Sequence, residues 1–471
     1  MDENAVFQGQ NLEQPQSYYQ PVQAPQMQTP PPPPPEEGSR FNFSPQALVK
    51  LLIGLVVVIL LLTVLIVVVL PRFTQKNNQK VTLVYWGLWE SPSVMQPVIS
   101  DFERQYPNIT VEYSQQDIKQ YRERLMTRIS NGNGPDVFRF HDSWYPMLSS
   151  YLAPLSSDTI SNADFSRLFY PVAVKDLVKN GAIYGIPLEI DTLGLYINTD
   201  ILKAAGLTPP ATWNDFVNDA KTMTVKDSSG KIKTAGAALG TYSNVTHAPD
   251  IMALLFAQNG VNMSTMTPAQ SASDALNFYT SFALDNANVW DNTLDPSILA
   301  FSKGNLAMYF GYSWDYFTIK AANPSLNFEI VPVPQLPGQN INIASYWVEG
   351  VSSKSKHQKE AMLFLKYLSQ ASTEQKLYGE ESKTRDFGEL YARTDLASTL
   401  EQNPTVSPFI KEAPTAVSSF FADGTYDDGL NSQVNTYLGN AINSMFNNTS
   451  ADTAIGTLSQ GVAQVLKQYG Q

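Results

Sequence analysis

Tryptophan, acidic and amide side chains gather at a few places in this chain, each just after a short apolar run. Indole faces stack on the C–H faces of sugar rings, and carboxylate and amide oxygens accept hydrogen bonds from hydroxyl groups. For any single tryptophan, packing in the core is an equally good interpretation, so their concentration is what favours a binding site. The candidate ligand-binding residues of this kind are Trp86, Trp89, Glu90, Gln116, Asp117, Asp142, Trp144, Trp314 and Asp315.

The sequence gives little support for a catalytic or metal-binding function. The three histidines, His141, His247 and His357, show no metal-ligand spacing, and the chain has no cysteine. It contains no G-x-S-x-G motif, no phosphate-binding P-loop and no glycine-rich dinucleotide turn. The sequence therefore predicts no catalytic residue, no metal site and no cofactor. A carbohydrate-active enzyme with paired carboxylates stays a distant alternative, because sequence does not give the separation of two carboxyl groups.

The elements that position the candidates form a regular order. Residues 81–85 alternate as in a strand, residues 94–106 repeat apolar side chains at helical spacing, and residues 109–113 alternate again. Strand, helix and strand in this order predict parallel strands in a doubly wound α/β sheet. Ligands bind such sheets outside the carboxyl ends of the strands, which is where the candidates lie. The last third of the chain is predicted to be mostly helical.

Residues 181–216 connect this region to the next one. A short hairpin at residues 181–185 ends before Pro187, an extended run follows, and a helix at residues 200–205 ends at Gly206. A capping pattern from Thr212 to Asp215 begins another helix. The acids Glu189 and Asp191 lie in the apolar extended run. They are either solvated acids at the edge of a strand or acids that face a cleft at a crossing between two lobes.

These residues resemble a known family. The run YGIPLEIDTLGLYINTDILKAAGLTPPATWNDF resembles the inter-lobe crossing of the extracellular solute-binding protein family 1, the maltose-binding-protein-like receptors of ABC importers. Four further segments resemble the family in the expected order: VTLVYWGLWE, FERQYPNITVEY, NGNGPDVFRFHDSW and FSKGNLAMYFGYSWDY. Near the end of the chain, residues 391–395 resemble a family loop that approaches the cleft. Arg385, nearby in sequence, is expected to be a solvated charge.

The resemblance implies a two-lobe, periplasmic-binding-protein-like α/β fold of type II, in which each lobe is a doubly wound sheet with flanking helices. We expect residues 81–189 and 308–352 in lobe 1, and residues 190–307 and 353–471 in lobe 2. It also implies capture of a small solute, most simply a sugar or oligosaccharide, by hinge closure for an ABC permease. The chain departs from the family at residues 345–350, where Trp347 and Glu349 replace a glycine-rich stretch. Trp347 is therefore a further candidate ligand contact, and the inherited ligand identity is open.

The N-terminal part has a different composition. Residues 1–47 form a tail rich in proline and glutamine that is typical of disorder. Residues 51–70 contain no charge, and 20 residues at a rise of ~1.5 Å span the ~30 Å core of a bilayer, so residues 48–70 are predicted to form a transmembrane helix. Residues 71–80 are a linker. We expect the tail in the cytoplasm and the large domain outside, although the positive charges flanking the helix mildly favour the reverse orientation.

The net charge of −12 excludes a broad nucleic-acid surface, which needs clustered lysine and arginine. A sensory or surface-interaction protein that reuses the same fold is the alternative to an importer receptor, because a fold does not determine a function.

Overall fold

The computed structural model describes residues 44–65, 80–284 and 288–471, and the chain divides into two compact units, Met1–Asn77 and Asn78–Gln471. In the first unit, the described helix is α1 (Pro45–Val64), and its aliphatic side chains are largely exposed. None of the helices within the described ranges is both long enough and apolar enough to cross a membrane. The predicted tail up to residue 43, the end of the predicted transmembrane segment at residues 66–70 and the linker up to residue 79 lie outside the described residues.

One five-stranded sheet begins the second unit. Its strands, in spatial order, are β2 (Ile109–Gln115), β1 (Val81–Gly87), β3 (Val137–His141), β14 (Trp347–Val351) and β6 (Ile186–Pro187). β1 pairs in parallel with β2 and β3, whereas β14 runs antiparallel to β3 and β6. Alternation along β1 buries Leu83 and Tyr85 completely and leaves Thr82 exposed. The predicted order of strand, helix and strand is thereby confirmed.

A second five-stranded sheet lies further along the chain. Its strands are β12 (Phe328–Val331), β8 (Gly194–Asn198), β11 (Leu306–Gly311), β10 (Ile232–Ala237) and β9 (Val225–Lys226). β8 is antiparallel to β11 and β12, and β10 is parallel to β11. β8 and β11 are buried along their whole length, which is why they read as continuous apolar runs.

Three chain segments join the two sheets. The first runs from β6 through β7 (Asp191–Thr192) to β8, and the second runs from β12 through β13 (Ala344–Ser345) to β14. β7 and β13 pair with each other in antiparallel register. The third segment contains residues 390 and 391. It lies beside the first, because the Ile190 amide donates to the Leu390 carbonyl at 2.8 Å and residue 189 forms a bridge with residue 391. The predicted crossing is thus a short bundle of extended segments.

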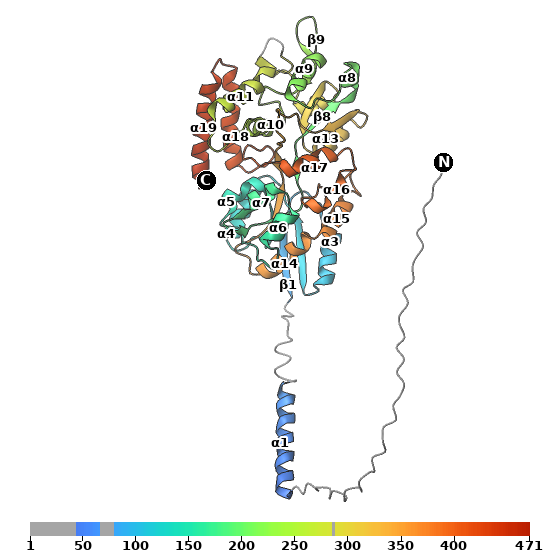
Figure 1. The fold of residues 1–471 in the computed structure, drawn as a ribbon, viewed down its shortest axis with the longest axis vertical. Helices are drawn as coiled ribbons and strands as arrows, with labels where there is room; N and C mark the ends of the chain where they lie inside the picture. The colour runs from blue at the N-terminus through green and yellow to red at the C-terminus, as the bar shows by residue number, and fades with distance from the viewer. Residues whose placement is uncertain (1–43, 66–79, 285–287) are drawn as a thin grey trace, which may run out of the picture. The chain divides into compact units, whose positions relative to one another are not determined.

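Long helices cover the sheets (Figure 1). α3 (Pro92–Gln105), α4 (Tyr121–Ser130), α14 (Gln358–Leu368) and α15 (Ala371–Glu381) accompany the first sheet. α9 (Trp213–Met223), α10 (Ala248–Gln258), α11 (Ala269–Leu284), α18 (Leu430–Met445) and α19 (Ala451–Gln468) accompany the second. α18 and α19 lie side by side and, with α11, form a helical layer (Figure 1).

Shorter helices fill the connections. They are η2 (Asp142–Trp144), α5 (Tyr145–Leu148), α6 (Asn162–Leu168), α7 (Pro171–Leu177), α8 (Thr199–Ala204), α12 (Ser297–Ser302), α13 (Asp315–Ala322), η3 (Thr394–Leu396), α16 (Ala397–Leu400), α17 (Ser407–Glu412) and η4 (Ala413–Thr415). The remaining strands, β4 (Val178–Lys179) and β5 (Ala182–Ile183), form a hairpin at residues 178–183, whereas the sequence predicted one at residues 181–185. Its turn is at Asn180 and Gly181, both of which have positive φ.

The predicted start of α9 is confirmed by its cap. The hydroxyl of Thr212 accepts a hydrogen bond from the Asp215 amide at 3.2 Å and donates one to the Asp215 carboxylate at 2.7 Å. These contacts satisfy a backbone donor that the first helical turn leaves free. Trp213, assigned to packing from the sequence, is buried and stacks on Phe310.

The strand pairing groups some residues differently from the predicted lobes. Residues 308–331 were expected in lobe 1, but β11 and β12 hydrogen-bond to β8 and therefore belong with the second sheet. Residues 358–381 were expected in lobe 2, but α14 packs on β1 and β14, and α15 packs on α3. Chain order alone does not reveal the pairing of β11 and β12 with β8 or the packing of α15 on α3, because these partners are more than 100 residues apart.

Candidate functional site

A cavity of about 690 Å³ lies where the connecting segments meet the strand ends of both sheets. We call this cavity the cleft. The first sheet contributes His141 and Trp347, the connecting segments contribute Glu189, Asp191 and Ser345, and the loop after β11 contributes Trp314 and Asp315. Residues that are more than 200 positions apart in the sequence, such as His141 and Trp347, therefore line the same cleft.

Two groups of aromatic side chains contribute to the cleft wall. Trp89 and Trp347 meet edge to face with ring centroids 5.2 Å apart, and Trp89 is 40% exposed. Trp314 stacks on Tyr312 with ring centroids 4.4 Å apart and an interplanar angle of 19°. Both groups are rigid apolar surfaces of the kind that stack on a sugar ring.

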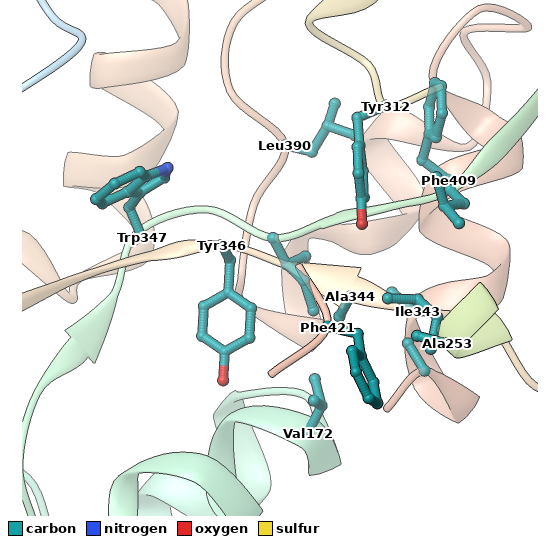
Figure 2. Close-up of a cluster of buried hydrophobic side chains, with 14 of the residues drawn as sticks. Val172, Ala253, Tyr312, Ile343, Ala344, Tyr346, Trp347, Leu390, Phe409 and Phe421 are labelled. Atoms are coloured by element: carbon teal, nitrogen blue, oxygen red, sulfur yellow. The ribbon is translucent and has the colours of Figure 1, made fainter. Parts of the chain in front are cut away.

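Strand alternation directs Trp347 into the cleft. Ser345 and Trp347 line the cleft, whereas the Tyr346 hydroxyl donates to Asp176 at 2.7 Å, beside a second cavity of about 660 Å³. Figure 2 shows the side chains of Trp347 and Tyr346 on opposite sides of this segment. The two cavities therefore lie on opposite faces of the same extended segment.

The two acids of the crossing differ in how well they are satisfied. Asp191 accepts hydrogen bonds from the Ser313 amide at 2.9 Å, from the Ser313 hydroxyl and from the Thr192 amide at 2.8 Å. Glu189 Oε1 lies 3.9 Å from Arg139, and Glu189 Oε2 has no hydrogen-bond partner among the described residues. Burial raises the pKa of both carboxyl groups well above the usual value, with Arg139 opposing the shift at Glu189.

Arg139 is the buried cation behind this wall. Its guanidinium donates to Glu349 at 2.7 Å and to Glu90 at 2.6 Å, and the Tyr85 hydroxyl donates to the same Glu349 oxygen at 2.8 Å. Burial opposes the charge of Arg139, but the surrounding carboxylates outweigh it and raise the pKa of Arg139 further. Two of the three nearby acids are thus held by one guanidinium, and Glu189 remains at the edge of the network.

A second group of charges lies beside the cleft, next to a smaller cavity of about 210 Å³ lined by Trp89, Glu90 and Glu381. Arg385 pairs with Glu381 at 3.1 Å and with Glu389 at 2.8 Å. The guanidinium of Arg385 also lies over the Phe317 ring, and its side chain is only 27% exposed. The expectation that Arg385 is a solvated charge is therefore wrong, because three partners from neighbouring segments hold it at the rim.

Half of the candidate ligand-binding residues predicted from the sequence line the cleft. Those that line it are Trp89, Glu189, Asp191, Trp314, Asp315 and Trp347. The other six candidates do not line it: Trp86, Glu90, Gln116, Asp117, Asp142 and Trp144.

Each of these six has another environment. Trp86 points away from the fully buried Tyr85 and packs near Tyr121, and Trp144 is fully buried. Glu90 is held by Arg139 and lines the smaller cavity.

The remaining three candidates, Gln116, Asp117 and Asp142, also lie outside the cleft. Asp117 is exposed in a turn before α4, where it accepts from the Lys119 amide, and Gln116 bonds to the neighbouring Ser114. Asp142 is buried and lines the second cavity.

The sequence did not reveal several residues of the cleft wall. They are His247, Arg385, Glu389, Asp423, Tyr426, Ser432 and Asn435. Most of them come from residues 422–435, which no periodic pattern distinguishes. The turn-forming run ADGTYDD at residues 422–428 was the one available signal, since loops of this composition often carry binding residues.

Comparison with known proteins gives a consistent set of matches. A profile described as bacterial extracellular solute-binding protein matches residues 86–375. The multiple sugar-binding protein of Streptococcus mutans is 26% identical over 334 residues, which cover 65% of this chain and 75% of that protein. The maltodextrin-binding protein of Bacillus subtilis is 23% identical over 339 residues, which cover 68% and 76%. A sugar-binding protein of Xanthomonas citri has a similar fold, with a TM-score of 0.67, 18% identity, and coverage of 82% and 98%.

Truncation of the buried Trp144 should destabilise the protein, whereas truncation of Trp89 should not. Trp144→Ala leaves a large cavity in the core and should lower the free energy of unfolding by about 3–5 kcal/mol. Trp89→Ala, at a position 40% exposed, should change it by less than about 1 kcal/mol. Denaturant titration of both variants beside the parent checks this. Equal losses in the two variants would contradict the assignment of Trp89 to the cleft wall and of Trp144 to the core.

The buried Glu381 should make stability fall as pH rises. Burial and the neighbouring Glu389 raise the pKa of Glu381 to about 8, whereas it is ~4.3 in an unfolded chain. The folded protein therefore holds this proton more tightly, and the resulting stabilisation is lost as pH rises from about 4.3 through 8. Between pH 5 and pH 8, the melting temperature of Glu381→Gln should fall less than that of the parent. The control Glu112→Gln, at an exposed position of β2, should fall as the parent does, and an equally steep fall in Glu381→Gln would contradict the account.

Proposed function

Because the chain belongs to the bacterial extracellular solute-binding protein family, we propose that it captures a sugar or oligosaccharide in the cleft and delivers it to an ABC-type permease. The family and the two-lobe α/β fold that the sequence predicted are confirmed by the profile match and by the solved structures of similar fold. The relatives named above are described as binding sugars, which supports this class of ligand.

The observation that carries the proposal is the composition of the cleft wall. Trp89, Trp314 and Trp347 supply aromatic faces, and Glu189 supplies a buried carboxylate oxygen without a hydrogen-bond partner among the described residues. A polyhydroxylated ring matches both, since it has apolar C–H faces and hydroxyl donors at its edge. A cavity of about 690 Å³ is in the range typical of small-molecule sites.

The mechanism we propose is closure of the two sheets around the solute. The loops of both sheets contribute to the cleft, and three extended segments join the sheets, so a solute in the cleft contacts both sides. Closure is favoured to the extent that the closed form binds the solute more tightly than the open form does. The residues of the cleft wall then serve binding rather than catalysis, as expected of a family of binding proteins.

We further propose that residues 51–70 anchor the protein in the membrane, with the proline-rich tail inside and the binding domain outside. The sequence supports this proposal, because the segment has no charge and the length of a bilayer span. The described part of this segment, within α1, exposes its aliphatic side chains. The match to an extracellular family supports this orientation.

The anchor predicts a specific fractionation. The full chain should remain in the membrane pellet after carbonate washing and should keep its N-terminus. Protease added to intact cells should degrade residues 80–471 and spare the tail, because the bilayer protects only the cytoplasmic side. A chain processed after residue 70, or recovered in the soluble fraction, would show that residues 51–70 are not an anchor.

Sugar binding predicts a ligand-dependent melting temperature. The full chain, purified in detergent, is tested with maltose, maltotriose, lactose and raffinose. A sugar present at about 100 times its dissociation constant should stabilise the protein by about 2.7 kcal/mol. Trp89→Ala should melt like the parent without sugar and bind about 30-fold more weakly, a loss of about 2 kcal/mol.

The control is Asp117→Asn, which changes an exposed acid outside the cleft. This variant should bind the sugar as the parent does. The proposal fails if no sugar of a broader panel raises the melting temperature. It also fails if Trp89→Ala binds as tightly as the parent, because the aromatic wall would then take no part in binding.

A further inference from the structure

A cluster of three potential metal ligands lies at the wall of the cleft, beside Trp314. One nitrogen of His247 and one carboxylate oxygen each of Asp250 and Asp423 lie within 4.8 Å of one another. His247 and Asp250 come from the start of α10, and Asp423 comes from a loop more than 170 residues later. We propose that these three residues bind a divalent transition-metal ion of the Zn²⁺ type, a function beyond the solute binding proposed above.

A nitrogen of His247 that makes no hydrogen bond is the observation that points to a metal. The imidazole is 6% exposed, and its Nε2 lies 2.9 Å from Asp315 Oδ2. Its Nδ1 is buried and has no hydrogen-bond partner among the described residues. The Asp423 Oδ2 atom is at an ion-pair distance of 3.4 Å from Nδ1, but it accepts its hydrogen bond from the His247 backbone amide, at 3.3 Å.

The contact with Asp315 determines which nitrogen is free to bind. Asp315 accepts only, so the Nε2 atom that faces it carries the proton, and Nδ1 of a neutral imidazole then presents its lone pair. That lone pair faces the lone pairs of the Asp423 carboxylate, and a cation between them turns a repulsive contact into two bonds. A carboxylate that orients a histidine through its other nitrogen is the usual outer partner of a metal-bound imidazole.

The Asp250 carboxylate is also held in place by two donors. The Tyr312 hydroxyl donates to one oxygen of Asp250 at 2.8 Å, and the Asp423 amide donates to the other at 3.0 Å. Asp250 is fully buried, so it has little access to water. With Asp315, three carboxylates lie around one imidazole, and those of Asp250 and Asp315 are buried. Burying two negative charges beside each other is costly unless a cation offsets them.

The donor set selects the class of ion. One imidazole nitrogen and two carboxylate oxygens form a mixed set that suits Zn²⁺ and its transition-metal neighbours, whereas Ca²⁺ and Mg²⁺ take oxygen ligands. Asp423 lies on a loop with its side chain 44% exposed, so it is free to adjust to the ion. His247 and Asp423 both line the cleft, which leaves a fourth position open to water or to a solute hydroxyl. A bound ion would also hold the loop that supplies Thr425 and Tyr426 to the cleft wall.

The test measures metal content without any sugar, so its result does not depend on the proposed function. The full chain, purified in detergent and treated with EDTA, is dialysed to equilibrium against micromolar ZnCl₂, and in parallel against CaCl₂ and MgCl₂. We expect one Zn²⁺ per chain, a raised melting temperature, and no comparable uptake of Ca²⁺ or Mg²⁺. Asp423→Asn, which keeps the size of the side chain, should weaken Zn²⁺ binding at least about tenfold.

The control is Asp428→Asn, the same change at an exposed acid of the same loop, which also lines the cleft. It should bind Zn²⁺ as the parent does, and melting of both apo variants shows that they are folded. Three results would overturn the proposal. In the first, the parent takes up no Zn²⁺, and a protonated His247 between Asp315 and Asp423 alone satisfies the cluster. In the second, Asp423→Asn binds Zn²⁺ as tightly as the parent, and the ion lies elsewhere. In the third, the parent takes up Ca²⁺ or Mg²⁺ in preference to Zn²⁺.

Discussion

The buried guanidinium of Arg139 is the constraint on which the arrangement of the cleft depends. A buried cation is tolerated only when paired carboxylates and hydrogen bonds offset its desolvation. Arg139 meets this condition by drawing Glu90 from the end of β1 and Glu349 from β14 to within 2.7 Å. The strand ends that frame the cleft are thus tied to one group, and these two acids are committed to structure. Each of the three acids has one oxygen without a hydrogen-bond partner among the described residues, but of the three only Glu189, at 3.9 Å from Arg139, lines the cleft and remains available to a solute.

The connecting segments then decide which side chains the solute meets. β13 and β7 pair across the junction, and alternation sends Ser345 and Trp347 to the cleft and Tyr346 to the opposite face, where it bonds to Asp176. The same alternation explains the pairing of Asp191 with Ser313, which fixes the loop that carries Trp314. A few residues of extended chain therefore link the two sheets and position an aromatic face from each side.

Patterns within short stretches of the sequence predicted the structural features that depend only on neighbouring residues. The strand, helix and strand at the start of the globular unit, the cap at Thr212, and the crossing near Glu189 follow from periodicity and turn chemistry within short windows. The grouping of β11 and β12 with the second sheet could not be predicted in this way, because it depends on pairing with β8 more than 100 residues away. The candidate site shows the same division. Trp89, Glu189 and Trp314 follow strands or lie in the crossing, whereas His247 and Asp423 meet only in the folded chain. Trp86 and Trp144 were misleading, because nearness to a strand end does not tell which way a side chain points.

The central claim is that a sugar closes the two sheets about the connecting segments. The chain has no cysteine, so Lys119→Cys and Lys303→Cys, two exposed positions associated with the first and second sheets, give a unique pair of spin labels. Pulsed electron paramagnetic resonance then measures the distance distribution between the labels, with and without the sugar that most raises the melting temperature. The account predicts that this sugar shifts the distribution to a new, narrower maximum. A sugar that binds and stabilises the protein while the distribution stays unchanged would contradict it.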